Sequence, residues 1–122
     1  MAVIELTEEN FEQTILDNNF IVIDFWAPWC GPCRGFAPVF EAASEKYPDI
    51  SFAKVDTQAH QALAGHFQIR SIPPLMIFRE QVIIYAQPGA LPAGAFDDLI
   101  ARAKEVDMAQ VHAEIAKEET KA

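Results

Sequence analysis

Residues 20–26 restrict most strongly how this 122-residue chain can fold. They read Phe-Ile-Val-Ile-Asp-Phe-Trp, and nearly all of them are apolar residues that favour β-structure. Because the apolar residues are consecutive rather than alternate, the strand should be buried on both faces, as in a parallel sheet covered by helices. Asp24 is the one charged residue in the run. The segment therefore predicts a buried strand of an α/β domain.

Hydrophobic patterning predicts alternating strands and helices around this segment. The other strands are expected at 3–6, 51–56, 75–78 and 82–85, and the helices at 8–17, 30–47, 58–67 and 92–106. In the first helix, Phe11, Ile15 and Leu16 should face the core. The last two strands should form a hairpin, although its turn lacks the usual Asn-Gly type of sequence. This order predicts an α/β fold in which helices cover a mixed central β-sheet of about five strands.

Residues 107–122 should form an extension of a single domain that comprises residues 1–106. Their apolar stripe, Met108, Val111 and Ile115, is rotated by roughly a quarter turn from that of the preceding helix. We therefore expect a separate short helix rather than a straight continuation. It could pack on the domain, mediate association between copies, or remain a frayed, solvated tail.

Charge and composition narrow the classes of function. The chain carries 18 acidic and 9 basic residues, a net charge of −9, which disfavours binding to nucleic acid or to anionic membranes. No apolar stretch is long enough to span a membrane. The first ten residues have none of the features of a signal peptide, so we expect a cytoplasmic protein. With only two cysteines, a secreted scaffold rich in disulfides is excluded.

Cys30 and Cys33 flank Gly31-Pro32 at the predicted start of a helix, and three interpretations compete. A structural crosslink would close too short a loop to stabilise the chain much. A closed zinc site needs four ligands, and His60 and His66 are the nearest additional candidates, at an unfavourable distance along the chain. A redox-active dithiol suits a Cys-x-x-Cys pair in a cytosolic βαβ context.

The physical chemistry of a helix N-terminus favours the redox interpretation. Free N–H groups and the positive end of the helix dipole stabilise a thiolate and lower the pKa of a cysteine placed there. Cys30, which precedes the first turn, should be exposed and nucleophilic. Cys33, one turn into the helix, should be more buried and react second.

The stretch from Phe25 to Cys33, Phe-Trp-Ala-Pro-Trp-Cys-Gly-Pro-Cys, resembles the active-site signature of the thioredoxin family. Residues 52–56 resemble the family's third strand, and residues 69–73 resemble the segment that carries its cis-proline. Gly89 resembles the glycine of its substrate groove. The resemblance extends from about Val3 to Ala103 and implies the thioredoxin fold with an added C-terminal helical tail.

The resemblance also implies a mechanism. Cys30 would attack a substrate disulfide to form a mixed disulfide, and Cys33 would then attack the Cys30 sulfur, release the reduced substrate and leave a Cys30–Cys33 disulfide. Asp24 would accept the Cys33 proton, and burial should raise its pKa towards neutrality. Lys54 should lie near Asp24 and moderate that rise. The implied substrate-binding residues are Trp29, Gly31, Pro32, Ile72, Pro73 and Gly89, with a cis bond before Pro73.

The implied activity is that of a cytoplasmic protein-disulfide reductase. Its partners would be disulfide-containing client proteins and an NADPH-dependent thioredoxin reductase. No bound cofactor or metal would be needed, since the two thiols are the redox centre. We expect a monomer, with weak association through the tail as an alternative. A disulfide oxidase or isomerase of the same fold, and a non-enzymatic binding module that uses the same groove, remain as other interpretations.

Overall fold

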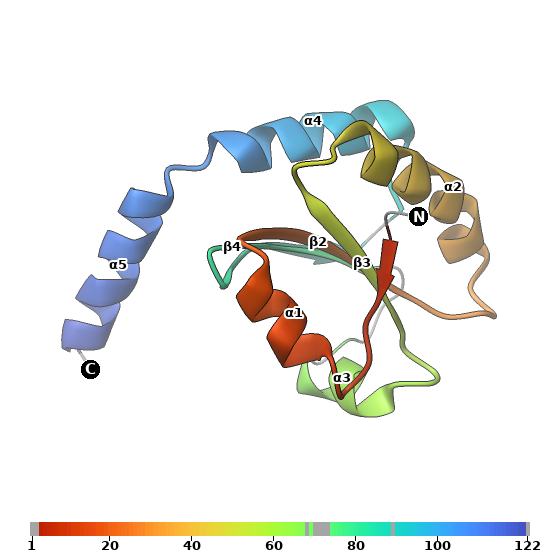
Figure 1. Cartoon of the computed structure of the whole chain (residues 1–122), viewed down its shortest axis with the longest axis horizontal. Helices are drawn as coiled ribbons and strands as arrows, with labels where there is room; N and C mark the ends of the chain where they lie inside the picture. The colour runs from red at the N-terminus through yellow and green to blue at the C-terminus, as the bar shows by residue number, and fades with distance from the viewer. Residues whose placement is uncertain (1–2, 68, 70–73, 89, 122) are drawn as a thin grey trace.

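The computed structural model describes residues 3–67, 69, 74–88 and 90–121 and contains a mixed five-stranded sheet in the order β1-β3-β2-β4-β5 (Figure 1). The strands are β1 (Val3–Glu5), β2 (Phe20–Trp26), β3 (Ser51–Asp56), β4 (Pro74–Arg79) and β5 (Val82–Pro88). The helices are α1 (Phe11–Asp17), α2 (Gly31–Lys46), α3 (Gln61–His66), α4 (Ala93–Glu105) and α5 (Met108–Lys121). The predicted fold class is thereby confirmed.

The central strand β2 pairs in parallel with β3 and antiparallel with β4. Its residues 21–23 and Phe25 are fully buried, so the prediction of a strand covered on both faces is confirmed. The antiparallel partner β4 belongs to the hairpin, so the sheet is mixed: β1, β3 and β2 pair in parallel, and β2, β4 and β5 pair antiparallel. Because β2 lies in the middle of the sheet, Asp24 near its C-terminal end pairs with Lys54 of β3 on one side and with Leu75 of β4 on the other.

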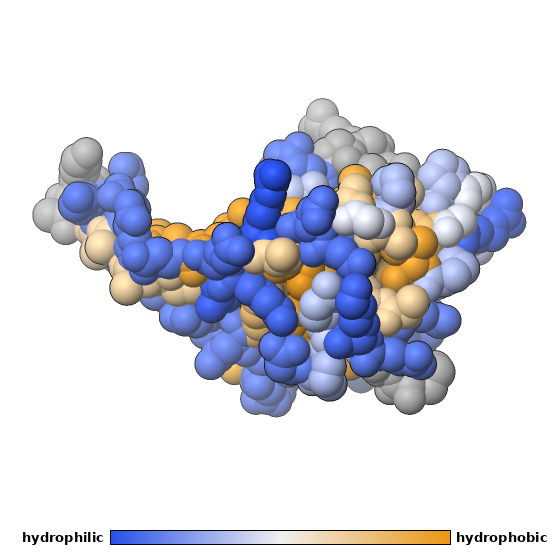
Figure 2. Space-filling view, turned by 90° about the horizontal axis from the view of Figure 1, so that it is seen from above, coloured by the Kyte–Doolittle hydropathy of each residue, from blue (hydrophilic) through white to orange (hydrophobic). Residues whose placement is uncertain are grey.

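Helices cover both faces of the sheet, with α2 and α4 on one face and α1 and α3 on the other (Figure 1). On the first face, the rings of Phe40 from α2 and Phe96 from α4 pack on Phe52 of β3, with centroids 5.4 and 6.4 Å away. On the other face, Phe67 follows α3 and packs against Phe25 of β2, 5.8 Å away. Seen from above in Figure 2, the side that carries α2 and α4 is largely hydrophilic, and hydrophobic residues show between the polar ones.

The first helix differs from its prediction at both its start and its inner face. Asn10 and Thr7 close a turn reciprocally: the Thr7 N–H donates to Asn10 Oδ1 at 2.7 Å and the Asn10 N–H to Thr7 Oγ1 at 3.3 Å. The helix therefore begins at Phe11 rather than at residue 8. The prediction that Leu16 faces the core is wrong, because it is 56% exposed. Ile15 is buried, and Leu16 points to solvent because successive residues of a helix lie about 100° apart around its axis.

The β4–β5 hairpin turns through only two residues, Glu80 and Gln81, both with left-handed backbone (φ 53° and 66°). Residues with a Cβ rarely adopt this backbone conformation, and two-residue turns of this kind usually have the sequence Asn-Gly. Contacts from the segment around α1 stabilise it instead. The Glu80 N–H donates to the Asn19 carbonyl at 2.8 Å, and Gln81 Nε2 donates to the Ile15 carbonyl at 3.1 Å.

The C-terminal extension is a separate helix, as predicted, and α5 projects from the body at one end of the molecule (Figure 1). Met108 in its first turn is only 6% exposed. Further along α5, His112 Nε2 lies 2.9 Å from Glu80 Oε1 of the hairpin turn. The start of α5 therefore packs on the domain. None of the helices in the described part of the chain combines the length and the apolarity that crossing a membrane requires.

Candidate active site

Cys30 and Cys33 lie at the N-terminal end of α2, where Cys30 occupies the N-cap position. Pro32 fits the first turn, because its fixed φ suits a helix and its missing N–H would have no helical partner there. The two sulfurs form a disulfide, with Cα atoms 5.2 Å apart. The Cys33 N–H donates to Cys30 Sγ at 3.1 Å. This donor and the helix dipole would stabilise a thiolate on Cys30 once the disulfide is reduced.

Cys30 is less accessible than the sequence suggested. Its exposed fraction is 4%, against 2% for Cys33, so the expectation of an exposed Cys30 is wrong for the disulfide-bonded protein. Both cysteines pack with Ala27, and Trp26 packs beside them, partly buried. The Cys30 N–H also donates to the Ala27 carbonyl at 3.1 Å, which folds the preceding loop onto the first turn of α2.

Trp29 is the accessible apolar group beside the disulfide. It is 66% exposed, more than any other large hydrophobic side chain in the described part of the chain. The loop that carries it is tied to α2, since Arg34 Nη1 lies 3.5 Å from the Pro28 carbonyl. At Gly31, a Cβ would meet none of the described atoms within 4 Å. Trp29, Gly31 and Pro32, which the sequence assigned to substrate binding, therefore lie next to the disulfide.

Asp24 is buried in β2, at 4% exposure, and burial raises its pKa from 3.8 to about 7. The Lys54 ammonium acts in the opposite sense and lowers that pKa. Lys54 acts on Asp24 because the two residues pair in the parallel β2–β3 ladder, so that both side chains lie on the face covered by α2. The direction of the shift and the opposing effect of Lys54 agree with the expectations from the sequence.

A cavity of about 100 Å³ brings Asp24, Lys54 and Cys33 together beneath α2. Trp26 forms part of its wall, and Asp24 Oδ1 has no hydrogen-bond partner among the described residues. A carboxylate with spare acceptor capacity therefore faces the same small space as the buried cysteine. Such a group can take a proton from a thiol, either directly or through one water molecule.

Sequence reasoning missed two further residues around this cavity, Arg34 and Glu41 of α2. The helical period could have found them, because Arg34, Ala37 and Glu41 recur at intervals of three and four after Cys33. Three residues assigned to the substrate groove, Ile72, Pro73 and Gly89, lie outside the described residues. Their roles stay predictions.

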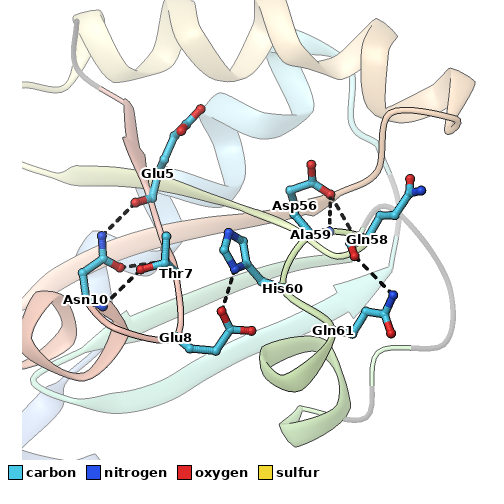
Figure 3. A network of polar contacts seen from close by, with 9 residues as sticks. All are labelled: Glu5, Thr7, Glu8, Asn10, Asp56, Gln58, Ala59, His60 and Gln61. Atoms are coloured by element: carbon cyan, nitrogen blue, oxygen red, sulfur yellow. Dashed lines mark hydrogen bonds and ion pairs between the residues drawn. The ribbon is translucent and has the colours of Figure 1, made fainter.

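One of the two histidines that the metal interpretation needed, His60, binds a carboxylate instead. His60 Nδ1 lies 2.6 Å from Glu8 Oε1, in the polar network shown in Figure 3. Among the residues that the structure describes, no three or more His, Cys, Asp or Glu side chains gather in a way that could hold a metal ion. The disulfide between the two cysteines supports the redox interpretation over the closed zinc site.

Comparisons of the sequence and of the structure with known proteins all point to the same family. The family model named Thioredoxin matches residues 2–105. A Streptomyces coelicolor protein assigned as thioredoxin 2 is 54% identical over 99% of this chain and 90% of its own length, and thioredoxin of Porphyra purpurea is 37% identical over 82% and 95%. Among solved structures, a mutant thioredoxin from Halobacterium salinarum is 30% identical, with a TM-score of 0.78 over 86% of this chain and 93% of that one.

Proposed function

Because the chain belongs to the thioredoxin family, we propose that it reduces disulfides in client proteins through Cys30 and Cys33. Family membership and the Cys30–Cys33 disulfide support thiol–disulfide oxidoreductase chemistry. The observation that carries the finer proposal is the cavity that joins Asp24 to Cys33 beneath the first turns of α2. This shared cavity supports Asp24 as the acceptor of the proton from Cys33, the thiol that must be activated in the second half of the reaction.

In the first step, the Cys30 thiolate attacks one sulfur of a substrate disulfide. A Cys30–substrate disulfide forms, the substrate S–S bond breaks, and the departing substrate thiolate takes up a proton. The N–H groups at the start of α2 stabilise the attacking thiolate. Trp29, Gly31 and Pro32 would line the substrate's path, together with Ile72, Pro73 and Gly89 of the family pattern.

In the second step, the Cys33 thiol gives its proton to the Asp24 carboxylate and attacks Cys30 Sγ. The bond between Cys30 and the substrate breaks, the substrate leaves as a thiolate, and the intramolecular disulfide forms. Two electrons have then passed from the dithiol to the substrate. A carboxyl pKa of about 7 suits this transfer, because acceptors work best near the operating pH. Lys54 limits the rise of that pKa.

The oxidised protein must regain two electrons to act again. We propose that an NADPH-dependent thioredoxin reductase supplies them, in the cytoplasm. We further propose that residues 1–106 form the redox domain, that residues 107–122 are an addition to it, and that the protein works as a monomer. No bound cofactor enters either step, because the two sulfurs themselves carry the electrons.

The proposal is tested by insulin reduction coupled to NADPH oxidation, with the reduction potential of the Cys30–Cys33 pair measured in parallel. We expect turnover and a reducing potential near that of thioredoxin-type dithiols, about −270 mV. Cys30→Ser should abolish turnover, whereas Cys33→Ser should trap the mixed disulfide. A strongly oxidising potential without insulin turnover would instead favour an oxidase. Full cellular function in the Cys30→Ser, Cys33→Ser double variant would favour a binding module.

A further inference from the structure

Three charged side chains stand in one row across three neighbouring strands. Glu5 of β1 pairs with Lys54 of β3, and Lys54 pairs with Asp24 of β2. Both ladders are parallel and in register, so the three side chains point to the same face of the sheet. The row consists of an exposed carboxylate, an ammonium group and a buried carboxylate, in that order.

The middle residue, Lys54, faces both carboxylates. Its Nζ lies 3.7 Å from Glu5 Oε1 and 5.4 Å from the centroid of the Trp26 ring. It lines the Asp24 cavity and also a second hollow of about 180 Å³, which Glu5 and Trp26 help to form. The Lys54 side chain is 33% exposed and that of Glu5 is 78% exposed. The ammonium group can therefore shift its position between a solvated partner and a buried one.

The backbone around Glu5 is fixed relative to this row. The Leu6 N–H donates to the Lys54 carbonyl at 2.9 Å, which continues the β1–β3 ladder. Asn10 Nδ2 donates to the Glu5 carbonyl at 2.9 Å, and the Glu5 carboxylate extends away from Asn10 (Figure 3). The strand thus presents the Glu5 side chain to Lys54, although that side chain is largely solvated.

We propose that Glu5 is a positioning residue that draws the Lys54 ammonium group away from Asp24. The inference rests on the proposed role of Asp24 as acceptor of the Cys33 proton. Without the Glu5 charge, Lys54 would move closer to Asp24 and stabilise the ionised carboxylate. The loss of a nearby negative charge would act in the same sense. Both effects lower the pKa of Asp24 and shift the pH dependence of the second step to lower pH.

Other titratable and charged groups face the same row. From α2, Cys33, Arg34 and Glu41 surround the Asp24 cavity. Asp56, the last residue of β3, and His60, which precedes α3, line the second hollow beside Lys54. All of them remain in a Glu5→Gln variant, and Cys33 does not titrate while it is in the disulfide. A change in the Asp24 titration between the two oxidised proteins therefore reports the change at Glu5.

The test is a carbon-13 carboxyl NMR titration of Asp24 in the oxidised full-length protein. We expect Glu5→Gln to lower the pKa of Asp24 by about 0.3 units, given the exposure of the Glu5–Lys54 pair. In a Lys54→Met background, the same substitution should produce less than half that shift, since only the direct charge effect remains. Lys54→Gln serves as the background if Lys54→Met does not fold. Glu9→Gln removes the same charge from the turn before α1 and should leave the pKa of Asp24 unchanged.

Equal shifts with and without Lys54 would overturn the proposal, because Glu5 would then act on Asp24 directly and not through Lys54. An equal shift in Glu9→Gln would also overturn it, because the effect would then be one of net charge. Failure of the proposed function has a different signature. If Asp24→Asn does not slow the resolution of a mixed disulfide, Asp24 is not the acceptor. The titration would still show whether Glu5 acts on Asp24 through Lys54.

Discussion

At the scale of single residues, burial of the Asp24 carboxyl group is the main free-energy cost of the site. Its pKa in the folded protein, about 7, lies well above the 3.8 of an exposed aspartate, because burial disfavours the charged form. The unfolded chain therefore releases this proton at lower pH than the folded one. The free energy of unfolding should fall as the pH rises from about 4 to about 7 and change little from this group above that range.

Asp24→Asn should remove this penalty. A shift of about three pKa units corresponds to about 4 kcal/mol at neutral pH, as an upper bound. We expect the variant to be more stable than the unsubstituted protein by about 2–4 kcal/mol at pH 8 and by much less near pH 4. Urea unfolding of both oxidised proteins across this range measures the difference. A difference that does not depend on pH would mean that Asp24 is not the group that titrates.

The hairpin turn contains a second costly residue. Gln81 adopts φ 66° and donates from Nε2 to the carbonyl of Ile15. Substitution by Gly or by Ala removes that hydrogen bond equally, but only Gly adopts this backbone conformation without strain. We expect Gln81→Gly to be more stable than Gln81→Ala by about 1 kcal/mol in thermal or urea unfolding. Equal stabilities would show that the turn relaxes out of the left-handed region.

At the scale of secondary-structure elements, Arg79 of β4 caps the C-terminal end of α4. Its Nη1 lies 3.0 Å from the carbonyl of Ala103 and 3.1 Å from that of Val106. Its guanidinium group also lies 5.1 Å from the centroid of the Phe20 ring. One side chain therefore fastens the last turn of α4 to the sheet at the point where the chain turns towards α5.

Arg79→Met keeps much of the aliphatic packing but removes the donors. We expect a loss of about 1.5–3 kcal/mol, because charged hydrogen bonds to half-buried carbonyls are lost. Arg79→Lys should recover only part of this, since a single ammonium group cannot reproduce the planar guanidinium. Chemical denaturation compares the three proteins. Full stability in Arg79→Met would show that water satisfies these carbonyls equally well.

The strands could be predicted from the sequence more closely than the ends of the helices. Consecutive apolar residues located β2, and its boundaries agree with the prediction at 20–26. The start of α3 could not be predicted from hydrophobic periodicity. The Asp56 carboxylate accepts hydrogen bonds from the N–H groups of Gln58 and Ala59, at 2.9 and 3.1 Å, so the helix begins only at Gln61. Such local side-chain bonds leave no trace in hydrophobic periodicity.

The residues of the candidate site could likewise be predicted from the sequence only in part. The signature around Cys30 and Cys33 indicated the redox centre, and the lone charge in a buried strand indicated Asp24. The role of Glu5 could not be predicted, because it depends on the register that aligns β1 with β3. The burial of Cys30 depends on how Ala27 and Trp26 fold around the disulfide, which residue spacing alone does not determine.

At the scale of the whole molecule, the redox centre and the extension lie at opposite ends of the sheet. The disulfide follows Trp26, at the C-terminal end of β2, whereas the hairpin turn follows Arg79, which pairs with Phe20 at the other end. Helix α5 contacts that turn through His112 and Glu80. A substrate at Cys30 and a partner at α5 would therefore not compete for space.

Deletion of residues 107–122 should lower stability and leave insulin reduction unchanged. It removes Met108, whose burial should contribute about 2 kcal/mol, and the contact between His112 and Glu80. Deletion of residues 117–122 alone is the control, because it keeps the packed first turns of α5, and it should leave stability unchanged. If the longer deletion also leaves stability unchanged, α5 is a solvated tail. If it lowers the molar mass in solution by half or more, α5 holds copies together.

If Cys33 gives its proton to Asp24 during reduction of a client disulfide, the rate at which a preformed mixed disulfide at Cys30 resolves depends on the ionisation of Asp24. Stopped-flow measurement in the unsubstituted protein should show a rate that rises with pH, reaches half its maximum near pH 7 and levels off about one pH unit higher, following the ionisation of Asp24. Asp24→Asn should slow the step by about 100-fold at neutral pH and remove the plateau. An unchanged rate and pH profile in Asp24→Asn would show that Asp24 does not accept the Cys33 proton.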